Sequence, residues 1–305
     1  MRKHIILYST MVCALAALVS CQCNRDKTTT TFEDNVEFKI DSMNMAEDLN
    51  KSKAILYTLP APIEMASLIK ESNVKYDESM LNDLNKSSQY NSNMKMALNV
   101  GIYTTDMSIA NMFNQSQKTV EYFNVLQNIT KRLGIVKLID EATFQKLEEK
   151  GTSKDDILNI ISEVYMNANQ YLTENNRKNI ATMVLTGGWT EGLYLALNLM
   201  GTKPNKQLTD RIIAQKLSLS TIINIIEQTN KDKQDEDLNY IMNKMLEIKM
   251  YFDEVKIEVN GKIEASTDPT TKTTKISANC NNEISQDILN LLKDKVNEIR
   301  NEFIN

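Results

Sequence analysis

Apolar residues recur every three or four positions along much of the chain, a spacing typical of helices that bury one face. One stripe of this kind predicts a helix over 120–133, and another predicts a helix over 157–172. A third predicts the C-terminal helix and consists of Ile284, Ile288, Leu292, Val296, Ile299 and Phe303. Pro62 suits the first turn of a further helix, and Gly134 and Gly151 suit helix ends. We therefore expect an all-α fold, with about nine to ten helices in a single domain over 55–305.

The stretch over 255–280 breaks this pattern, because its apolar residues alternate with polar ones. A tight turn at Asn260-Gly261 would divide the apolar residues between two faces, whereas a continuous strand over 255–265 keeps them on one face. We therefore predict one long β-hairpin, with its turn near Pro269, inserted before the C-terminal helix. The alternating apolar residues that we expect to lie on one face of this hairpin are Val255, Ile257, Val259, Ile263, Ala265, Ile276, Ala278 and Cys280.

The N-terminus has the form of an export signal that is cut off. Arg2 and Lys3 precede an apolar stretch from Ile5 to Ser20, which is shorter than the roughly 20 residues of a membrane span. The stretch ends in Leu-Val-Ser-Cys, which resembles the bacterial lipobox, where a small residue precedes a cysteine that becomes acylated. We predict a signal peptide over 1–20 and a lipid anchor, palmitate included, at Cys21.

Residues 21–54 are polar and include a run of threonines, which predicts a tether and a weakly ordered lead-in to the domain. Gln22, directly after the lipidated cysteine, resembles the outer-membrane default of bacterial lipoproteins. We therefore expect an outer-membrane anchor that faces the periplasm. Asp41-Ser42-Met43 resembles a short acceptor motif for O-glycosylation, which makes Ser42 a candidate modification site.

Charge and missing residue types exclude several classes of function. Without the leader the chain keeps 33 basic and 40 acidic residues, a net charge of −7, which disfavours nucleic-acid binding. The one histidine, His4, lies in the leader, so the mature chain has no imidazole for Ser-His-Asp catalysis or for most zinc sites. We expect no metal and no cofactor. Cys23 and Cys280 could pair in an oxidising periplasm, but two unpaired thiols are the simpler expectation.

The most distinctive stretch places three glycines inside one predicted helix. Gly187, Gly188 and Gly192 together cost about 3 kcal/mol of helix propensity relative to alanine, which suggests a packing requirement. Gly188 and Gly192 share one face and leave a groove. The groove admits either a closely crossing helix or a ligand, and both interpretations stay open. The residues beside it are Trp189, Glu191 and Tyr194.

Two acids stand among apolar neighbours, where a buried carboxyl group needs a partner or a raised pKa. Asp106 is interpreted either as a helix N-cap or as a functional acid. Glu191 is interpreted either as a paired core acid or as a functional acid. The two regions also align at an offset of 87 residues, with Gly101 opposite Gly188, which suggests a divergent duplication.

Four segments together resemble a family of predicted outer-membrane lipoproteins of the Bacteroidota. They are residues 59–64, 99–106, 113–117 and 187–194, of which the last two are the most specific. The resemblance covers most of residues 55–305. That family has no assigned activity, so the resemblance implies a compartment and a helical body but no catalytic residues.

These observations lead to three hypotheses about function. The first is a non-enzymatic, lipid-anchored accessory or scaffold protein with a protein partner in the cell envelope. The second is binding of a small or lipid-like molecule near the glycine-rich helix, because 16 methionines suit adaptable apolar surfaces. The third is a helical glycoside hydrolase that uses Asp106 and Glu191, for which one tryptophan and 6 % aromatic residues are few.

Overall fold

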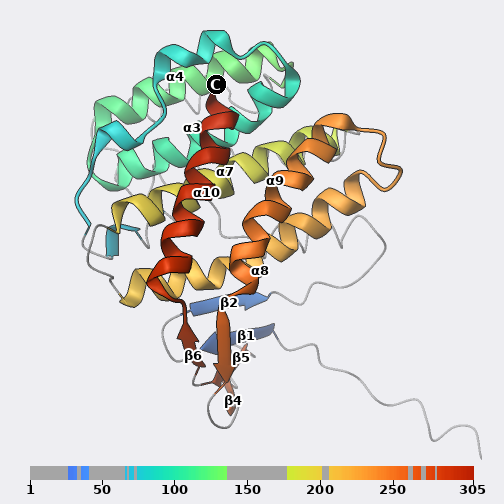
Figure 1. Cartoon of the computed structure of the whole chain (residues 1–305). Coiled ribbons are helices and arrows are strands. Elements are labelled where there is room, and N and C mark those ends of the chain that lie inside the picture. The colour runs from blue at the N-terminus through green and yellow to red at the C-terminus, as the bar shows by residue number, and fades with distance from the viewer. Residues whose placement is uncertain are drawn as a thin grey trace, which may run out of the picture.

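The computed structural model describes residues 66, 69–71, 74–135, 177–200, 206–259, 264–268, 273–278 and 280–305, and the strands at 27–32 and 36–40 (Figure 1). Its α-helices are α3 (Asn93–Met112), α4 (Ser116–Arg132), α7 (Lys178–Leu199), α8 (Lys206–Thr229), α9 (Glu236–Asp253) and α10 (Gln286–Ile304). Two short 3₁₀ helices, η1 (Glu78–Met80) and η2 (Leu84–Gln89), precede α3. Helices dominate these residues, so the prediction of a mostly α-helical fold is confirmed. The number of helices in the whole chain stays a prediction.

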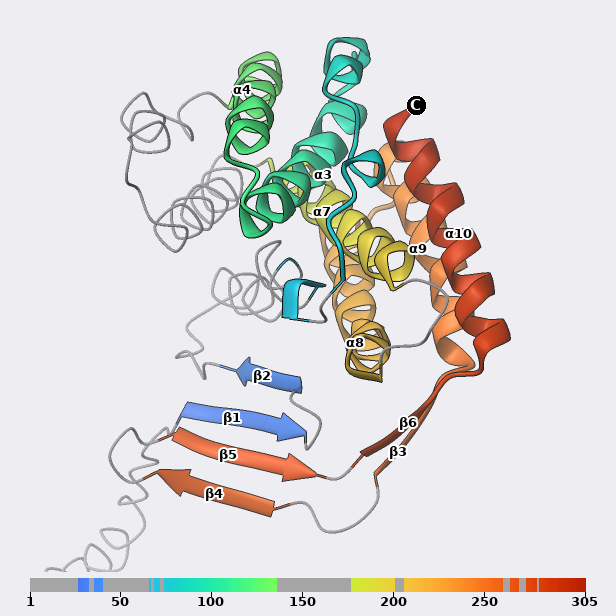
Figure 2. The same cartoon turned by 90° about the vertical axis from the view of Figure 1, so that its left-hand side faces the viewer.

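Helices α3 and α7 cross at the centre of the helical body. Residues 96–111 of α3 and 180–193 of α7 are buried without interruption, so neither helix has a solvent-facing side over those residues. Helix α4 packs against α3, and both α8 and α10 pack against α7. Helix α9 contacts α8 and α10 on the outer side (Figure 2). The crossing of α3 and α7 is therefore covered by helices from distant parts of the sequence.

The outer helices follow the apolar stripes of the sequence. Helix α4 matches the stripe over 120–133, and α10 buries Leu292, Val296, Ile299 and Phe303 completely. Ser285 caps α10 by accepting a hydrogen bond from the backbone N–H of Ile288. The stripe over 157–172 lies outside the described residues.

Gly134 ends α4 as the sequence predicted. Its φ of 75° lies in the left-handed region, which glycine adopts without steric cost. The N–H of Gly134 donates to the carbonyl of Lys131, and the N–H of Ile135 donates to the carbonyl of Thr130. This pair of bonds is a Schellman motif, which satisfies the last carbonyl groups of the helix. The second predicted helix end, Gly151, lies outside the described residues.

Six strands complete the described elements: β1 (Lys27–Phe32), β2 (Val36–Ile40), β3 (Lys256–Val259), β4 (Glu264–Asp268), β5 (Thr273–Ala278) and β6 (Cys280–Glu283). β3 pairs with β6 in antiparallel register, with Lys256 opposite Glu283, and β4 pairs with β5, with Asp268 opposite Thr273. β1 pairs with β2 in antiparallel and with β5 in parallel orientation, giving the sheet order β2-β1-β5-β4. In Figure 2, β3 and β6 continue from the ends of α9 and α10.

β1 and β2 fall within residues 21–54, where the sequence analysis predicted a tether and no strand. The run of four threonines in β1 is compatible with this backbone, because β-branched side chains favour extended strands. Among the helices of the described ranges, none combines the length and the apolar character that a bilayer crossing requires.

Candidate functional site

The two central helices approach each other through glycines. A Cβ atom built on Gly101 would lie 2.0 Å from the carbonyl oxygen of Val184, and one built on Gly187 would lie 2.1 Å from the carbonyl oxygen of Leu98. Real Cβ atoms do not approach backbone atoms so closely, so any side chain at these two positions would push the helices apart. Gly188 is less crowded, with Gly101 O at 3.3 Å from its added Cβ. The groove at Gly187 and Gly188 is therefore occupied by the backbone of α3.

The contacts at this crossing are symmetric at an offset of 86 residues rather than 87. Gly101 contacts Val184, and Leu98 contacts Gly187, which is the same pair of positions with the helices exchanged. Thr104 and Thr190, also 86 residues apart, each bond through Oγ1 to the carbonyl four residues earlier, at 2.7 and 2.8 Å. The sequence alignment at an offset of 87 residues paired Gly101 with Gly188, whereas these contacts pair Gly101 with Gly187.

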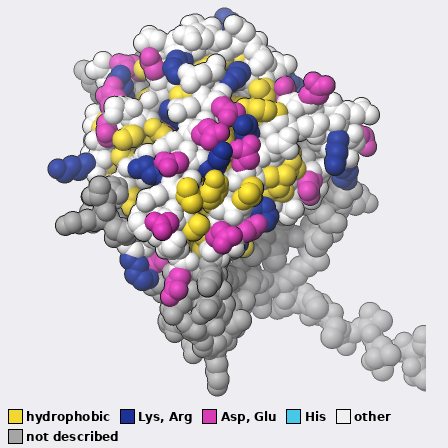
Figure 3. Space-filling model, viewed as in Figure 1, with side chains coloured by type: hydrophobic (Ala, Val, Ile, Leu, Met, Phe, Trp, Pro, Cys, Tyr) yellow, Lys and Arg dark blue, Asp and Glu magenta, His cyan; other side chains and the backbone are white. Residues whose placement is uncertain are grey.

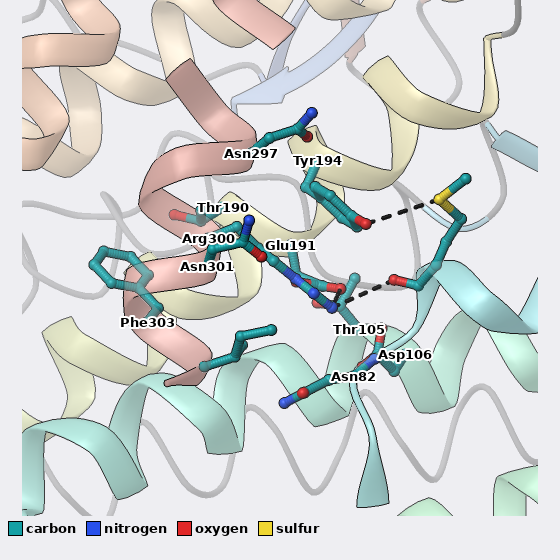
Figure 4. Close-up of polar contacts among 12 residues, drawn as sticks. Asn82, Thr105, Asp106, Thr190, Glu191, Tyr194, Asn297, Arg300, Asn301 and Phe303 are labelled. Atoms are coloured by element: carbon teal, nitrogen blue, oxygen red, sulfur yellow. Dashed lines mark hydrogen bonds and ion pairs between the residues drawn. The ribbon is translucent and has the colours of Figure 1, made fainter. Parts of the chain in front are cut away.

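A buried ion pair lies beside the crossing (Figure 4). Arg300 of α10 donates from Nε to Glu191 Oε2 and from Nη2 to Glu191 Oε1, both at 2.9 Å. The side chain of Glu191 is fully buried and that of Arg300 is 6 % exposed. Glu191 is therefore a paired core acid, which forms a bidentate ion pair with one guanidinium group. The ring of Tyr194 covers the other side of the guanidinium group, 4.4 Å from its central carbon.

Asp106 lies next to this pair but has no cation of its own. It sits in the middle of α3, so its interpretation as a helix N-cap is wrong; Ser92 caps that helix. Its Oδ2 accepts a hydrogen bond from the backbone N–H of Asn82 at 3.0 Å, and its Oδ1 has no partner. Burial raises the pKa of Asp106 well above its ordinary value, and the charge of Glu191 raises it further, whereas Arg300 lowers it. Although burial opposes its charge, the pKa of Arg300 is raised by Glu191.

A segment that we call the strap, residues 77–91, closes over these acids. Its central residue, Asn82, is 1 % exposed and donates from Nδ2 to Tyr90 Oη and Asn99 Oδ1. The carbonyl of Asn82 accepts a hydrogen bond from Tyr122 Oη of α4 at 3.1 Å. Arg300 Nη2 also donates to the carbonyl of Met80 at 3.3 Å. The strap is thereby fixed to α3, α4 and α10, and it separates Asp106 from solvent.

The other residues of the glycine-rich helix have structural partners. Trp189 is buried, and its Nε1 donates to Gln215 Oε1 of α8 at 3.0 Å. Tyr194 is partly buried, and its hydroxyl contacts the sulfur of Met80 at 3.8 Å. Gly192 is buried in α7. Gly188 faces α3, with Gly101 O 3.3 Å from its added Cβ, so the closely crossing helix is confirmed there, and the tightest contacts lie at Gly187 and Gly101.

Arg300 and Asn82, the two residues that complete the cluster, were not among the residues predicted from the sequence. Arg300 lies four residues after Val296, on the buried stripe of α10, so a charged residue in an apolar stripe was the available signal. Asn82 lies in an irregular segment and its sequence context carries no comparable signal. The contacts of Asn82 depend on the tertiary fold alone.

Several predicted sites cannot be placed. Cys21, Cys23 and Ser42 lie outside the described residues, and Cys280 is described only as part of the backbone of β6. Within the described ranges, no three His, Cys, Asp or Glu side chains gather in a way that could hold a metal ion. Because the side chains of Cys23 and Cys280 are outside the described residues, the expectation of two unpaired thiols stays a prediction.

The cluster of Asp106, Glu191 and Arg300 is built like a structural network rather than a reaction centre. A general acid or base must reach the atom whose proton it transfers, but both carboxyl groups here are fully buried. Each polar group is oriented by backbone atoms or by another buried side chain. Comparisons with protein-family models, curated proteins and solved structures find no match to this chain.

Proposed function

We propose that the protein is a non-enzymatic accessory or scaffold protein of the cell envelope, anchored to the outer membrane by lipid at Cys21 and facing the periplasm. The lipobox-like sequence before Cys21 supports the anchor. The helical domain then presents its surface to a protein partner. The observation that carries this proposal is an exposed apolar face on α8, α9 and α10.

The described residues expose four large apolar side chains on these three helices. They are Leu217, Leu246, Met250 and Leu291, with exposed fractions of 42 to 70 %. Leu246 and Met250 lie one turn apart on α9, and Lys295 of α10 bonds Glu247 beside them. Lys216 Nζ donates to the carbonyl of Val255, so α8 packs beside the C-terminal end of α9. Figure 3 shows hydrophobic side chains among charged ones on this face.

The charges around this face favour a protein over a lipid surface. Lys249 pairs with Asp253, and Lys295 pairs with Glu247 and Glu298, so both signs alternate around the apolar residues. An anionic membrane surface attracts clusters of basic residues and repels such acids. A mixed polar rim around an apolar centre is characteristic of protein interfaces. We therefore assign the face to a protein partner in the envelope.

We also propose that residues 255–280 form one long β-hairpin in a domain of nine or ten helices. The pairing of β3 with β6 and of β4 with β5 supports a single reversal of the chain between 268 and 273. Glu258 pairs with Asn281, which is incompatible with a tight turn at Asn260-Gly261. The hairpin projects from the same end of α9 as the apolar face, and this position favours a role in partner contact.

The two alternative functions have less support. A ligand in the groove at Gly187 and Gly188 would have to displace the backbone of α3. A glycoside hydrolase needs two carboxyl groups that reach a sugar in an open cleft, whereas Asp106 and Glu191 are fully buried. The scaffold proposal requires neither site.

Fractionation of cells that produce Cys21→Ala tests the anchor. We expect the variant to leave the membrane fraction and to lack the mass of the acyl chains. Its retention in the membrane fraction with unchanged mass would overturn the assignment.

A photo-crosslinking amino acid at Met250 tests the docking face in the native cells. We expect one protein adduct from position 250 and none from exposed Asn124 on α4, the matched control. Adding Leu246→Glu should abolish the adduct while the thermal unfolding temperature stays unchanged. Equal adducts from both positions, or an adduct that persists with Leu246→Glu, would contradict docking at this face.

A further inference from the structure

The buried core beneath the strap holds two acids but only one cation bonded to them, among the residues that the structure describes. Asp106 and Glu191 are both fully buried, but Arg300 is the one cation bonded to either of them within the described residues. The Nε and Nη2 atoms of that guanidinium group both donate to Glu191. Asp106 receives a single backbone N–H, from Asn82, and its Oδ1 faces no donor. A second ionised carboxylate without a cation is strongly disfavoured at such a position.

We propose that the Asp106 and Glu191 carboxyl groups share one bound proton, which keeps the strap closed, and that release of this proton as the pH rises opens the strap. In the closed state Oδ1 of Asp106 carries the proton and donates it toward Glu191. That bond gives Oδ1 a partner and leaves one negative charge facing Arg300. The core is then electrically balanced.

The groups that face Asp106 come from every element packed against it. The strap and the residue before it contribute an amide and a tyrosine, α3 and α4 contribute one tyrosine each, and α7 and α10 contribute a tyrosine and the ion pair. They are Tyr76, Asn82, Tyr103, Tyr122, Glu191, Tyr194 and Arg300. Lys118 already pairs with Glu78 and Glu121 at 2.9 Å, so it does not neutralise Asp106.

The strap is the element that can move when the proton leaves. On the opposite side, α3 and α7 are in backbone contact at Gly101 and Gly187 and cannot separate without losing the crossing. The strap is irregular, contains two 3₁₀ turns, and bonds Asp106 through Asn82 and Arg300 through Met80. Water that hydrates the second charge therefore enters where the strap lies. The strap opens with the loss of one proton, and no other ligand is required.

The sign of the pH dependence follows from the direction of the shift. The unfolded chain loses the proton of Asp106 near its ordinary pKa of 3.8, and the folded chain holds it to higher pH. The protonated form therefore contributes its full stabilisation below about pH 3.8, and this contribution is lost as the pH rises through the folded-state pKa. Opening of the strap should accompany that loss.

Hydrogen–deuterium exchange of the folded protein between pH 6 and pH 9, corrected for intrinsic exchange rates, tests this proposal. Between the ordinary pKa of Asp106 and its raised folded-state pKa, protection of residues 77–91 should fall by up to about tenfold per pH unit, and it should level off once the pH exceeds the folded-state value. Asp106→Asn is neutral at every pH and keeps an oxygen for the N–H of Asn82. We expect its strap to stay protected across the range, whereas Glu227→Gln on the exposed surface of α8 should behave as the wild type.

Infrared spectroscopy provides a second measurement that does not depend on a variant's folding. The wild type should show the carbonyl band of a protonated buried carboxyl group at pH 5, above the ordinary pKa of 3.8, and the band should disappear over the pH range in which the strap opens. Absence of the band at pH 5 would overturn the proposal. So would strap protection that changes equally with pH in the wild type and in Asp106→Asn.

Discussion

Gly101 of α3 and Gly187 of α7 are equivalent residues at the crossing of the two central helices. Each places its Cα hydrogen where any side chain would overlap a backbone carbonyl of the other helix, at 2.0 Å for Gly101 and 2.1 Å for Gly187. Neighbouring Gly188 has more room, with 3.3 Å between its added Cβ and Gly101 O. Of the two adjacent glycines of α7, Gly188 therefore has more room for a side chain than Gly187.

Gly187→Ala should destabilise the protein by about 3 kcal/mol or more, because the overlap is with backbone and cannot be relieved by a rotamer change. Gly188→Ala is the matched control and should change the free energy of unfolding by less than about 1 kcal/mol, since a slight shift is offset by the gain in helix propensity. Urea denaturation of both variants measures the difference. Equal destabilisation by both would mean that the close crossing is not at Gly187.

Arg300→Met should cost about 3–5 kcal/mol, because it leaves the fully buried carboxylate of Glu191 without a cation. The double variant Arg300→Met/Glu191→Leu should regain much of this loss, since neither charge then remains. Lys249→Met is the control for an exposed pair, with Asp253, and should cost no more than about 1 kcal/mol. A double variant as unstable as Arg300→Met would refute the ion-pair explanation.

Gln215→Leu should destabilise the protein by about 1–3 kcal/mol, because it leaves the buried indole N–H of Trp189 without an acceptor. Circular dichroism during denaturation measures the effect in this variant and in Trp189→Phe. The double variant should lose less than the sum of the two single variants, since it removes donor and acceptor together. Strict additivity would show that the hydrogen bond contributes nothing to stability.

Glu302→Gln should reduce the loss of stability in acid. Hydrogen bonds from Lys244 and Tyr240 lower the pKa of Glu302 below its ordinary 4.5, so its contribution is present above pH 4.5 and is lost as the pH falls through the lower folded-state value. The effect should stay under about 1 kcal/mol, because the side chain is 35 % exposed. Thermal unfolding from pH 3 to pH 7 measures it, with Glu227→Gln as control. If the unfolding temperature of Glu302→Gln fell in acid as much as that of the wild type, this assignment would be contradicted.

Much of the outer helical architecture could be predicted from local pattern. The stripe ending in Phe303 predicted α10, the stripe over 120–133 predicted α4, and Gly134 ended α4, because helical periodicity and the left-handed conformation of glycine are properties of a few neighbouring residues. The central helices lack such a stripe, since α3 and α7 are buried on all sides. Their glycines indicated close packing, but not which residue makes it.

The sequence by itself predicted that the chain is mainly helical and that the glycines of one helix meet a packing requirement. Only the tertiary structure decided that Gly101 and Gly187 make the tightest approach between α3 and α7, that Arg300 pairs with Glu191 across 109 positions, and that Asn82 bonds Asp106 across 24. Periodicity and propensity act within a few turns of chain. Which distant residues share a buried polar cluster depends on how the helices pack, and that is a property of the fold as a whole.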